Sequence, residues 1–103
     1  MLIVTTNDIP TKELEILGLV RGSTIQTVNA LRDIGSGLKT IVGGELKKYN
    51  EMMDKARAIA TDRMVEEANS MGADAVIGFR YTTSSIMQSA AEVLAYGTAV
   101  KFK

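Results

Sequence analysis

Four polar side chains in this sequence have types and positions that could hold a small ligand: Arg32, Glu45, Tyr49 and Arg80. They offer two cations, one carboxylate and one phenol, and a guanidinium group is well suited to binding an acid. Each residue adjoins an element that we expect to be buried, so we place the ligand site between subunits of an oligomer. The alternative is that the four side chains form salt bridges and hydrogen bonds between subunits.

Two residue types that carry much of enzyme chemistry are missing. The chain has no histidine and no cysteine, so it lacks the commonest general base, a thiolate nucleophile and the usual ligands of zinc and copper. We therefore expect no catalytic residue, no cofactor and no metal ligand, and we do not expect an enzyme. Two alternatives stay open: an enzyme whose site is built at subunit interfaces from arginine, tyrosine and carboxylates, and a protein that binds a metal through carboxylates.

The charge of the chain is balanced, with 12 basic and 12 acidic residues. This balance supplies no general attraction to nucleic acid or to an anionic membrane. No stretch approaches the roughly 18 apolar residues of a membrane span, and the first residues do not have the pattern of a signal peptide. We expect a cytoplasmic protein with no nucleic-acid or membrane partner.

Other polar residues have simpler expected roles. Asp62, Glu66 and Glu67 could supply oxygen ligands to a hard cation, but carboxylates on an exposed helix face are usually only solvated. Arg80 lies in a strand otherwise rich in apolar residues, and if it is buried it needs a carboxylate, for which Glu92 on the next strand is the nearest candidate. The three tyrosines could donate hydrogen bonds to a ligand, although each has a position typical of a core.

Alternation and spacing predict the elements that position these residues. Strands are expected at Leu2–Thr5, Glu13–Val28, Ala75–Ser84 and Ala91–Phe102, and a helix at Glu45–Met71. The stretch Asn29–Gly44 has helical spacing that glycines interrupt, which predicts a short helix, a kink and a further turn of helix. The expected fold is α+β with the order β-β-α-β-β, one long helix packed on an antiparallel sheet, and residues 1–103 in a single domain.

The long helix is the clearest of these elements. Apolar residues step by three or four along it and form one stripe: Leu46, Tyr49, Met53, Ala56, Ala60, Met64, Ala68 and Met71. Gly72 is a natural residue to follow its last turn. At about 1.5 Å per residue the helix is roughly 40 Å long. This exceeds the width of a small domain, so one end should meet a neighbour.

Alternation also assigns faces to the expected strands Glu13–Val28 and Ala75–Ser84. In Glu13–Val28, one face carries Leu14, Ile16, Val20 and Val28 and the other Leu17, Leu19 and Ile25, and Gly18 and Gly22 interrupt the strand as at a bulge or a bend. In Ala75–Ser84, one face carries Ile77, Phe79 and Tyr81 and the other Val76, Gly78, Arg80 and Thr82.

The last strand has no polar face. One face carries the small residues Ala91, Val93, Ala95, Gly97 and Ala99, and the other carries Leu94, Tyr96, Thr98, Val100 and Phe102. A strand that is apolar on both faces needs cover on both sides, and one helix can cover only one of them. We expect another subunit to cover the second face, and therefore a stable homo-oligomer.

Several segments closely resemble the YbjQ-like family of small bacterial proteins, which are often labelled heavy-metal-binding. They are Gly43-Gly-Glu45, the helix with Tyr49 and Ala56-Arg57, the stretch from Glu67 to Val76, and Ala95-Tyr-Gly-Thr-Ala-Val100. The resemblance covers nearly the whole chain. It implies a small α+β subunit grouped with dodecin-like subunits, assembled as a ring-shaped pentamer, and no established activity. Because soft metals prefer thiolate or imidazole ligands, the metal label does not match this sequence, and we expect a non-catalytic binding or structural module.

Overall fold

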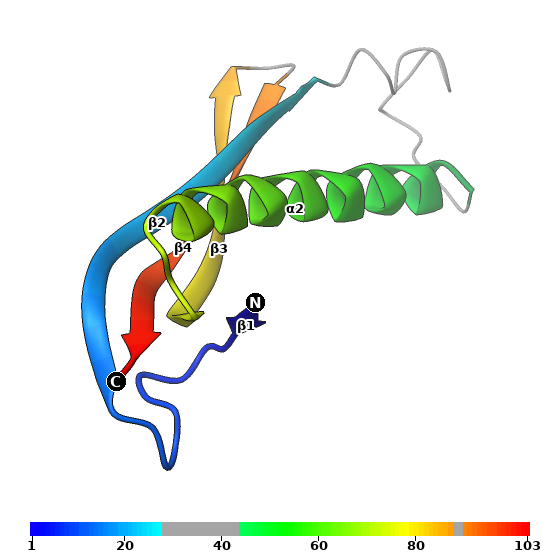
Figure 1. Cartoon of the computed structure of the whole chain (residues 1–103). Helices are drawn as coiled ribbons and strands as arrows, with labels where there is room; N and C mark the ends of the chain where they lie inside the picture. Colours follow the sequence, from blue (N-terminus) through cyan, green and yellow to red (C-terminus); the bar gives the residue numbers. More distant parts are fainter. Residues whose placement is uncertain (28–43, 88–89) are drawn as a thin grey trace.

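The computed structural model describes residues 1–27, 44–87 and 90–103, and only the backbone of 27, 44–46, 48–49 and 87. The elements are β1 (Leu2–Ile3), β2 (Leu14–Thr27), α2 (Gly44–Ser70), β3 (Ala75–Met87) and β4 (Ala90–Phe102) (Figure 1). The predicted order and the predicted long helix are confirmed. The stretch predicted as a kinked helical segment lies almost wholly outside the described residues.

The four strands form one sheet in the order β1-β3-β4-β2. Strands β2 and β3 both run antiparallel to β4, as predicted. Strand β1 instead pairs in parallel with the start of β3, with Leu2 opposite Ala75 and Ile3 opposite Val76. The sheet is therefore mixed, with one parallel pair and two antiparallel pairs. Between β1 and β2 the chain crosses from one edge of the sheet to the other.

Helix α2 packs on one face of this sheet through its small side chains. Ala56, Ala60, Met64 and Ala68 are fully buried, which confirms the predicted stripe in this part of the helix. They lie in one cluster with residues of three strands: Val20, Val76, Phe79, Val93, Ala95 and Ala99. The small face predicted for β4 is thus the face under α2. Alanines here let the helix backbone come close to the strands, and this allows a thin, dense core.

A bulge in β3 makes the predicted faces of that strand partly wrong. Ile77 pairs with Thr98, but the next registered pair is Arg80 with Tyr96, so β3 has one extra residue. Gly78 occupies this bulge with a φ of 60°, a conformation that glycine adopts without the steric cost of a side chain. Alternation restarts after it. Val76 therefore faces the helix, as Phe79 does, and Ile77 faces the opposite side.

A second bulge has the same effect in β2. Ile16 pairs with Val100 and Gly18 with Ala99, so Leu17 is the extra residue. Leu17 packs against the helix-side core, whereas Ile16 is 63% exposed. The predicted grouping of Ile16 with Val20 is therefore wrong. The bulge predicted near Gly18 is confirmed, while Gly22 is buried beneath α2 without a bulge.

The face of the sheet opposite α2, here called the outer face, is covered at one end by the chain itself. A second cluster there contains Ala75, Ile77 and Val100, against which pack the half-buried Val4, Ile9, Leu14 and Phe102. The segment between β1 and β2 thus covers part of the face that we had assigned wholly to another subunit. Its Lys12 ammonium lies 5.1 Å from the centre of the Phe102 ring, within the range of a cation–π contact.

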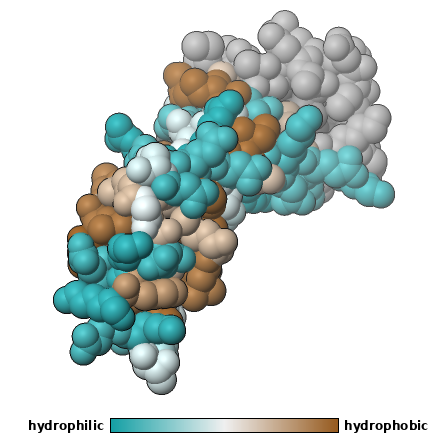
Figure 2. All heavy atoms as spheres, viewed as in Figure 1, coloured by the Kyte–Doolittle hydropathy of each residue, from teal (hydrophilic) through white to brown (hydrophobic). Residues whose placement is uncertain are grey.

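The rest of the outer face has no cover from the described residues. Leu19 and Ile25 are 64% and 57% exposed. In Figure 2, which shows the molecule from the side of Figure 1, hydrophobic patches also interrupt the hydrophilic surface at the sheet end of the molecule. The first turns of α2 extend beyond the sheet (Figure 1). In the described parts of the chain, no helix is both long and apolar enough to cross a membrane.

Candidate functional site

Of the four residues predicted to hold a ligand, only Arg80 has a described side chain. Arg32 lies outside the described residues, and Glu45 and Tyr49 lie in the first turns of α2, where the structure describes only the backbone. These turns extend away from β3, the strand that carries Arg80 (Figure 1). One chain therefore does not bring Glu45 and Tyr49 next to Arg80, and a site built from them needs a second chain.

The Arg80 side chain joins the N-terminal segment to β3. Its Nη1 donates hydrogen bonds to the carbonyl oxygen of Thr5 at 3.0 Å and to that of Phe79 at 2.7 Å. The predicted pairing with Glu92 is wrong, because the register places Glu92 opposite Ser84, four residues from Arg80. Arg80 is also exposed. An exposed guanidinium needs no carboxylate partner, and two backbone carbonyls satisfy part of its donor capacity.

A groove on the outer face is the site that sequence reasoning missed. It is lined by Leu19 and Arg21 of β2, Leu94 and Tyr96 of β4, and Thr82 of β3, and its volume is about 330 Å³. Arg21 lies directly opposite Tyr96, and Leu94 lies directly opposite Thr82. We call these five residues the outer groove. Of the five, only Tyr96 was considered as a ligand contact from sequence, since the other four come together only through the register of three strands.

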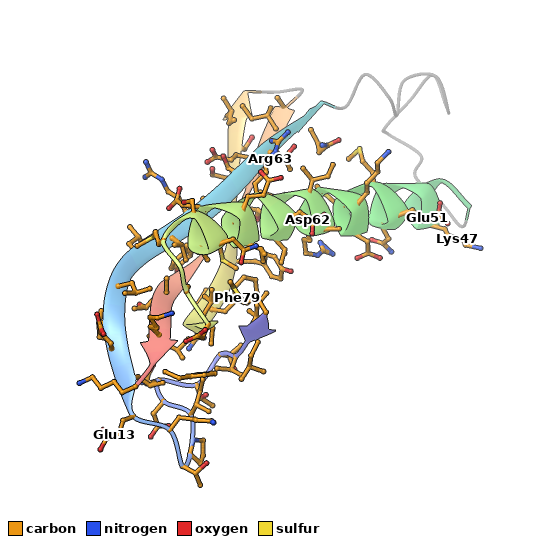
Figure 3. All side chains as sticks on the ribbon, in the orientation of Figure 1. Glu13, Lys47, Glu51, Asp62, Arg63 and Phe79 are labelled. Carbon is orange, nitrogen blue, oxygen red and sulfur yellow. The ribbon has the colours of Figure 1, made fainter. Side chains whose placement is uncertain are left out.

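Two charged side chains of α2 occupy the free edge of β2 beside this groove. Arg63 donates from Nη1 to the carbonyl oxygen of Ser23 at 2.6 Å, and Glu67 accepts the backbone N–H of Arg21 at 3.3 Å. Figure 3 shows Arg63 on the side of α2 next to β2. An edge strand presents unpaired backbone groups, and this pair satisfies two of them. The Arg21 guanidinium is not used in these bonds.

Tyr81 connects the other side of α2 to β3. The Thr61 hydroxyl donates a hydrogen bond to the carbonyl oxygen of Arg57 at 2.8 Å. Because its one hydrogen is used there, the Thr61 oxygen accepts the hydrogen bond that the Tyr81 hydroxyl donates at 2.7 Å. The Tyr81 ring also meets the Phe79 ring edge-on, with centroids 4.7 Å apart. Tyr81 is 44% exposed, so it does not occupy the core position predicted for it. Its hydroxyl ties the helix to the sheet.

Comparison with known proteins places the whole chain in one family. The YbjQ family model, described as "Putative heavy-metal-binding", matches residues 1–103. The chain belongs to the YbjQ-like family. The YbjQ-like chain is 65% identical over 101 residues to a UPF0145 protein of Clostridium novyi, covering 98% of each. It is 53% identical over 104 residues to a UPF0145 protein of Thermotoga maritima, covering 100% of this chain and 98% of the relative.

A solved structure shares the fold of this YbjQ-like chain. It is the crystal structure of a protein of unknown function from Pediococcus pentosaceus, assigned to the DUF74 family. The TM-score is 0.72 at 20% sequence identity, and the match covers 100% of this chain and 98% of the other. At this identity the likeness concerns the fold. The names of the two UPF0145 relatives state no activity.

The heavy-metal description of the family does not fit the donor groups of this YbjQ-like chain. The sequence has no cysteine and no histidine, and soft metals prefer thiolate and imidazole. Among the described residues, no three histidine, cysteine, aspartate or glutamate side chains form a group that could hold a metal ion. Of the carboxylates considered from sequence, Glu67 is engaged with the Arg21 amide, and Asp62 and Glu66 are exposed on α2.

We expect the tag-free YbjQ-like protein not to bind zinc, copper or nickel tightly, because exposed carboxylates alone bind these ions weakly. Isothermal titration calorimetry with each ion should show no sub-micromolar site. A protein carrying a hexahistidine tag is the positive control for detection. Sub-micromolar binding at one ion per chain, in the absence of a tag, would contradict this expectation.

Proposed function

We propose that this chain is the subunit of a ring-shaped homo-oligomer, a pentamer, that acts as a non-catalytic binding or structural module. The observation that carries this proposal is the uncovered part of the outer face, where Ile16, Leu19 and Ile25 are each more than half exposed. Large aliphatic side chains that are exposed along one strand favour an association surface. The ring and the number five come from the family resemblance.

The edges of the sheet also favour association. Strand β2 is at one edge of the sheet along its full length. At the other edge β1 has only two residues, and backbone hydrogen bonds from the N-terminal segment reach no further along β3 than Phe79. The rest of β3 therefore faces no other described strand. Edges that no other strand covers can pair with another chain, and two such edges on one subunit suit a closed ring. Arg63 and Glu67 occupy the β2 edge only at Ser23 and Arg21.

A non-catalytic role agrees with the side chains that the chain offers. Histidine and cysteine are absent from the sequence. The outer groove combines two leucines, two hydroxyl groups and one guanidinium, which suits binding more than proton transfer, because none of these groups has an ordinary pKa near neutrality. The expected cytoplasmic location and the expected absence of nucleic-acid and membrane partners stay predictions.

Light scattering at micromolar protein concentration tests the assembly. We expect a mass near five times the 11.1 kDa of one chain. Ile25→Asp should reduce this mass, because the added charge would have to be buried between subunits, while the far-ultraviolet circular dichroism stays that of the parent. Ala58→Asp, which adds the same charge at an exposed position on α2, is the control. A parent mass near 11.1 kDa would disprove the proposal.

A further inference from the structure

The three polar groups of the outer groove are without partners in the part of the chain that the structure describes. The Arg21 guanidinium, the Tyr96 hydroxyl and the Thr82 hydroxyl make no hydrogen bond or ion pair there. The other described arginines all have partners: Arg57 with Asp54, Arg63 with Ser23, and Arg80 with Thr5 and Phe79. Among these arginines, Arg21 is the one whose side chain is free to bind something else.

The Arg21 guanidinium has no described carboxylate partner on the outer face, although the Glu67 carboxylate of α2 accepts the Arg21 backbone N–H at the strand edge. The register puts Arg80, itself bonded to backbone carbonyls, on the far side of Tyr96 from Arg21. Glu92 points to the same face of β4, but it is four residues from Tyr96, roughly 13 Å along a strand. No described carboxylate on the outer face is therefore in position to pair with Arg21. Among the residues that line the groove, Arg21 is the charged one, and Arg80 adds a second positive charge on the other side of Tyr96.

We propose that the outer groove binds a small organic acid, with one carboxylate and an apolar body. This proposal rests on the binding role proposed above and names the ligand class. Because Leu19 also belongs to the proposed association surface, the acid would be held between this face and the neighbouring subunit. The planar guanidinium of Arg21 matches a carboxylate through two parallel N–H···O bonds, and the hydroxyls of Tyr96 and Thr82 add further donors. Leu19 and Leu94 contact the apolar body.

Size and charge favour a monocarboxylate over a phosphate ester. The groove volume of about 330 Å³ is near the lower limit for small-molecule pockets. A phosphate monoester carries a charge of about −1.5 to −2 at neutral pH, whereas Arg21 is the one charged residue that lines the groove and Nη1 of Arg80 is already bonded to two backbone carbonyls. A carboxylate carries one negative charge, and an aliphatic or aromatic body buries the leucine surface that is otherwise exposed.

Calorimetric titration of the assembled protein with octanoate and with benzoate tests this assignment. We expect saturable binding of at least one of the two acids, and binding at least tenfold weaker for the corresponding neutral amide. Arg21→Gln and Tyr96→Phe should each weaken acid binding, the first by tenfold or more. Arg57→Gln removes a charge from an arginine outside the groove and should bind the acid as the parent does.

The mass of each variant separates this proposal from the proposed assembly. We expect Arg21→Gln to keep the parent mass in light scattering while it loses the acid. If its mass falls and the parent binds neither acid, Arg21 is a contact between subunits, which overturns the ligand and leaves the oligomer in place. Acid binding that Arg21→Gln leaves unchanged also overturns the proposal. A monomeric parent that binds octanoate through Arg21 would retain the ligand and disprove the oligomer.

Discussion

An Ala60→Asp chain is expected to lose its fold at room temperature. Ala60 is fully buried between α2 and the sheet, and the surrounding cluster is apolar, so an aspartate there would have no partner. Burying an unpaired charge costs several kcal/mol, which is comparable to the whole stability of a domain of this size, about 5–15 kcal/mol. Far-ultraviolet circular dichroism and a urea titration at fixed protein concentration measure the loss.

Ala58→Asp is the matched control for this change. The residue lies on the same helix, two positions earlier, and it is exposed. The substitution and its helix propensity cost are the same, so the difference between the two variants isolates burial. A cooperative unfolding curve for Ala60→Asp within about 1 kcal/mol of that of Ala58→Asp would contradict the packing of α2 described above.

Gly22→Ala is expected to destabilise the protein by about 3 kcal/mol, the upper end of the usual cost of overpacking. A methyl group on Gly22 would overlap the carbonyl oxygen of Ala60 and the amide nitrogen of Met64, and it would lie 2.8 Å from the carbonyl carbon of Arg63. These are backbone atoms of α2, so a change of rotamer cannot relieve the contact. The helix would have to move away from the sheet. Thermal or urea unfolding measures the effect.

Gly72→Ala separates this steric effect from backbone strain. Gly72 follows α2 with a φ of 77°, and a methyl group there would meet nothing within 4 Å. That variant should lose only about 1 kcal/mol, the cost of a left-handed conformation for alanine. The reverse ranking, with Gly72→Ala the less stable variant, would mean that α2 does not approach β2 as closely as described.

Helix α2 could be predicted from sequence because its pattern is local. The buried side chains Ala56, Ala60, Met64 and Ala68 recur at the period of one helix turn. The faces of β2 and β3 could be predicted only as far as the bulges at Leu17 and Gly78. Beyond each bulge every side chain changes face, and the position of an extra residue depends on the partner strand as well as on the strand itself.

The candidate site was harder to predict for the same reason. Which residue of β4 lies beside Arg80 depends on the register between β3 and β4, and the extra residue in β3 shifts that register. The expected contact with Glu92 was wrong for this reason. The outer groove depends on the register of three strands. The Arg21 side chain can be recognised as unpaired only once its neighbours are known to lack a carboxylate. The free Arg21 side chain in an alternating strand was nonetheless a visible signal, because a charged residue between Val20 and Gly22 must face away from the core.

The two bulges have a consequence for how this sequence can vary in evolution. Substitutions beside Gly78 change side chains but keep the register, whereas the deletion of one residue at this bulge would exchange inner and outer side chains on one side of it. If the pairs from Arg80 onward were kept, Val76 and Ile77 would exchange environments. Related proteins should therefore tolerate amino-acid substitutions in this strand far better than the insertion or deletion of a residue.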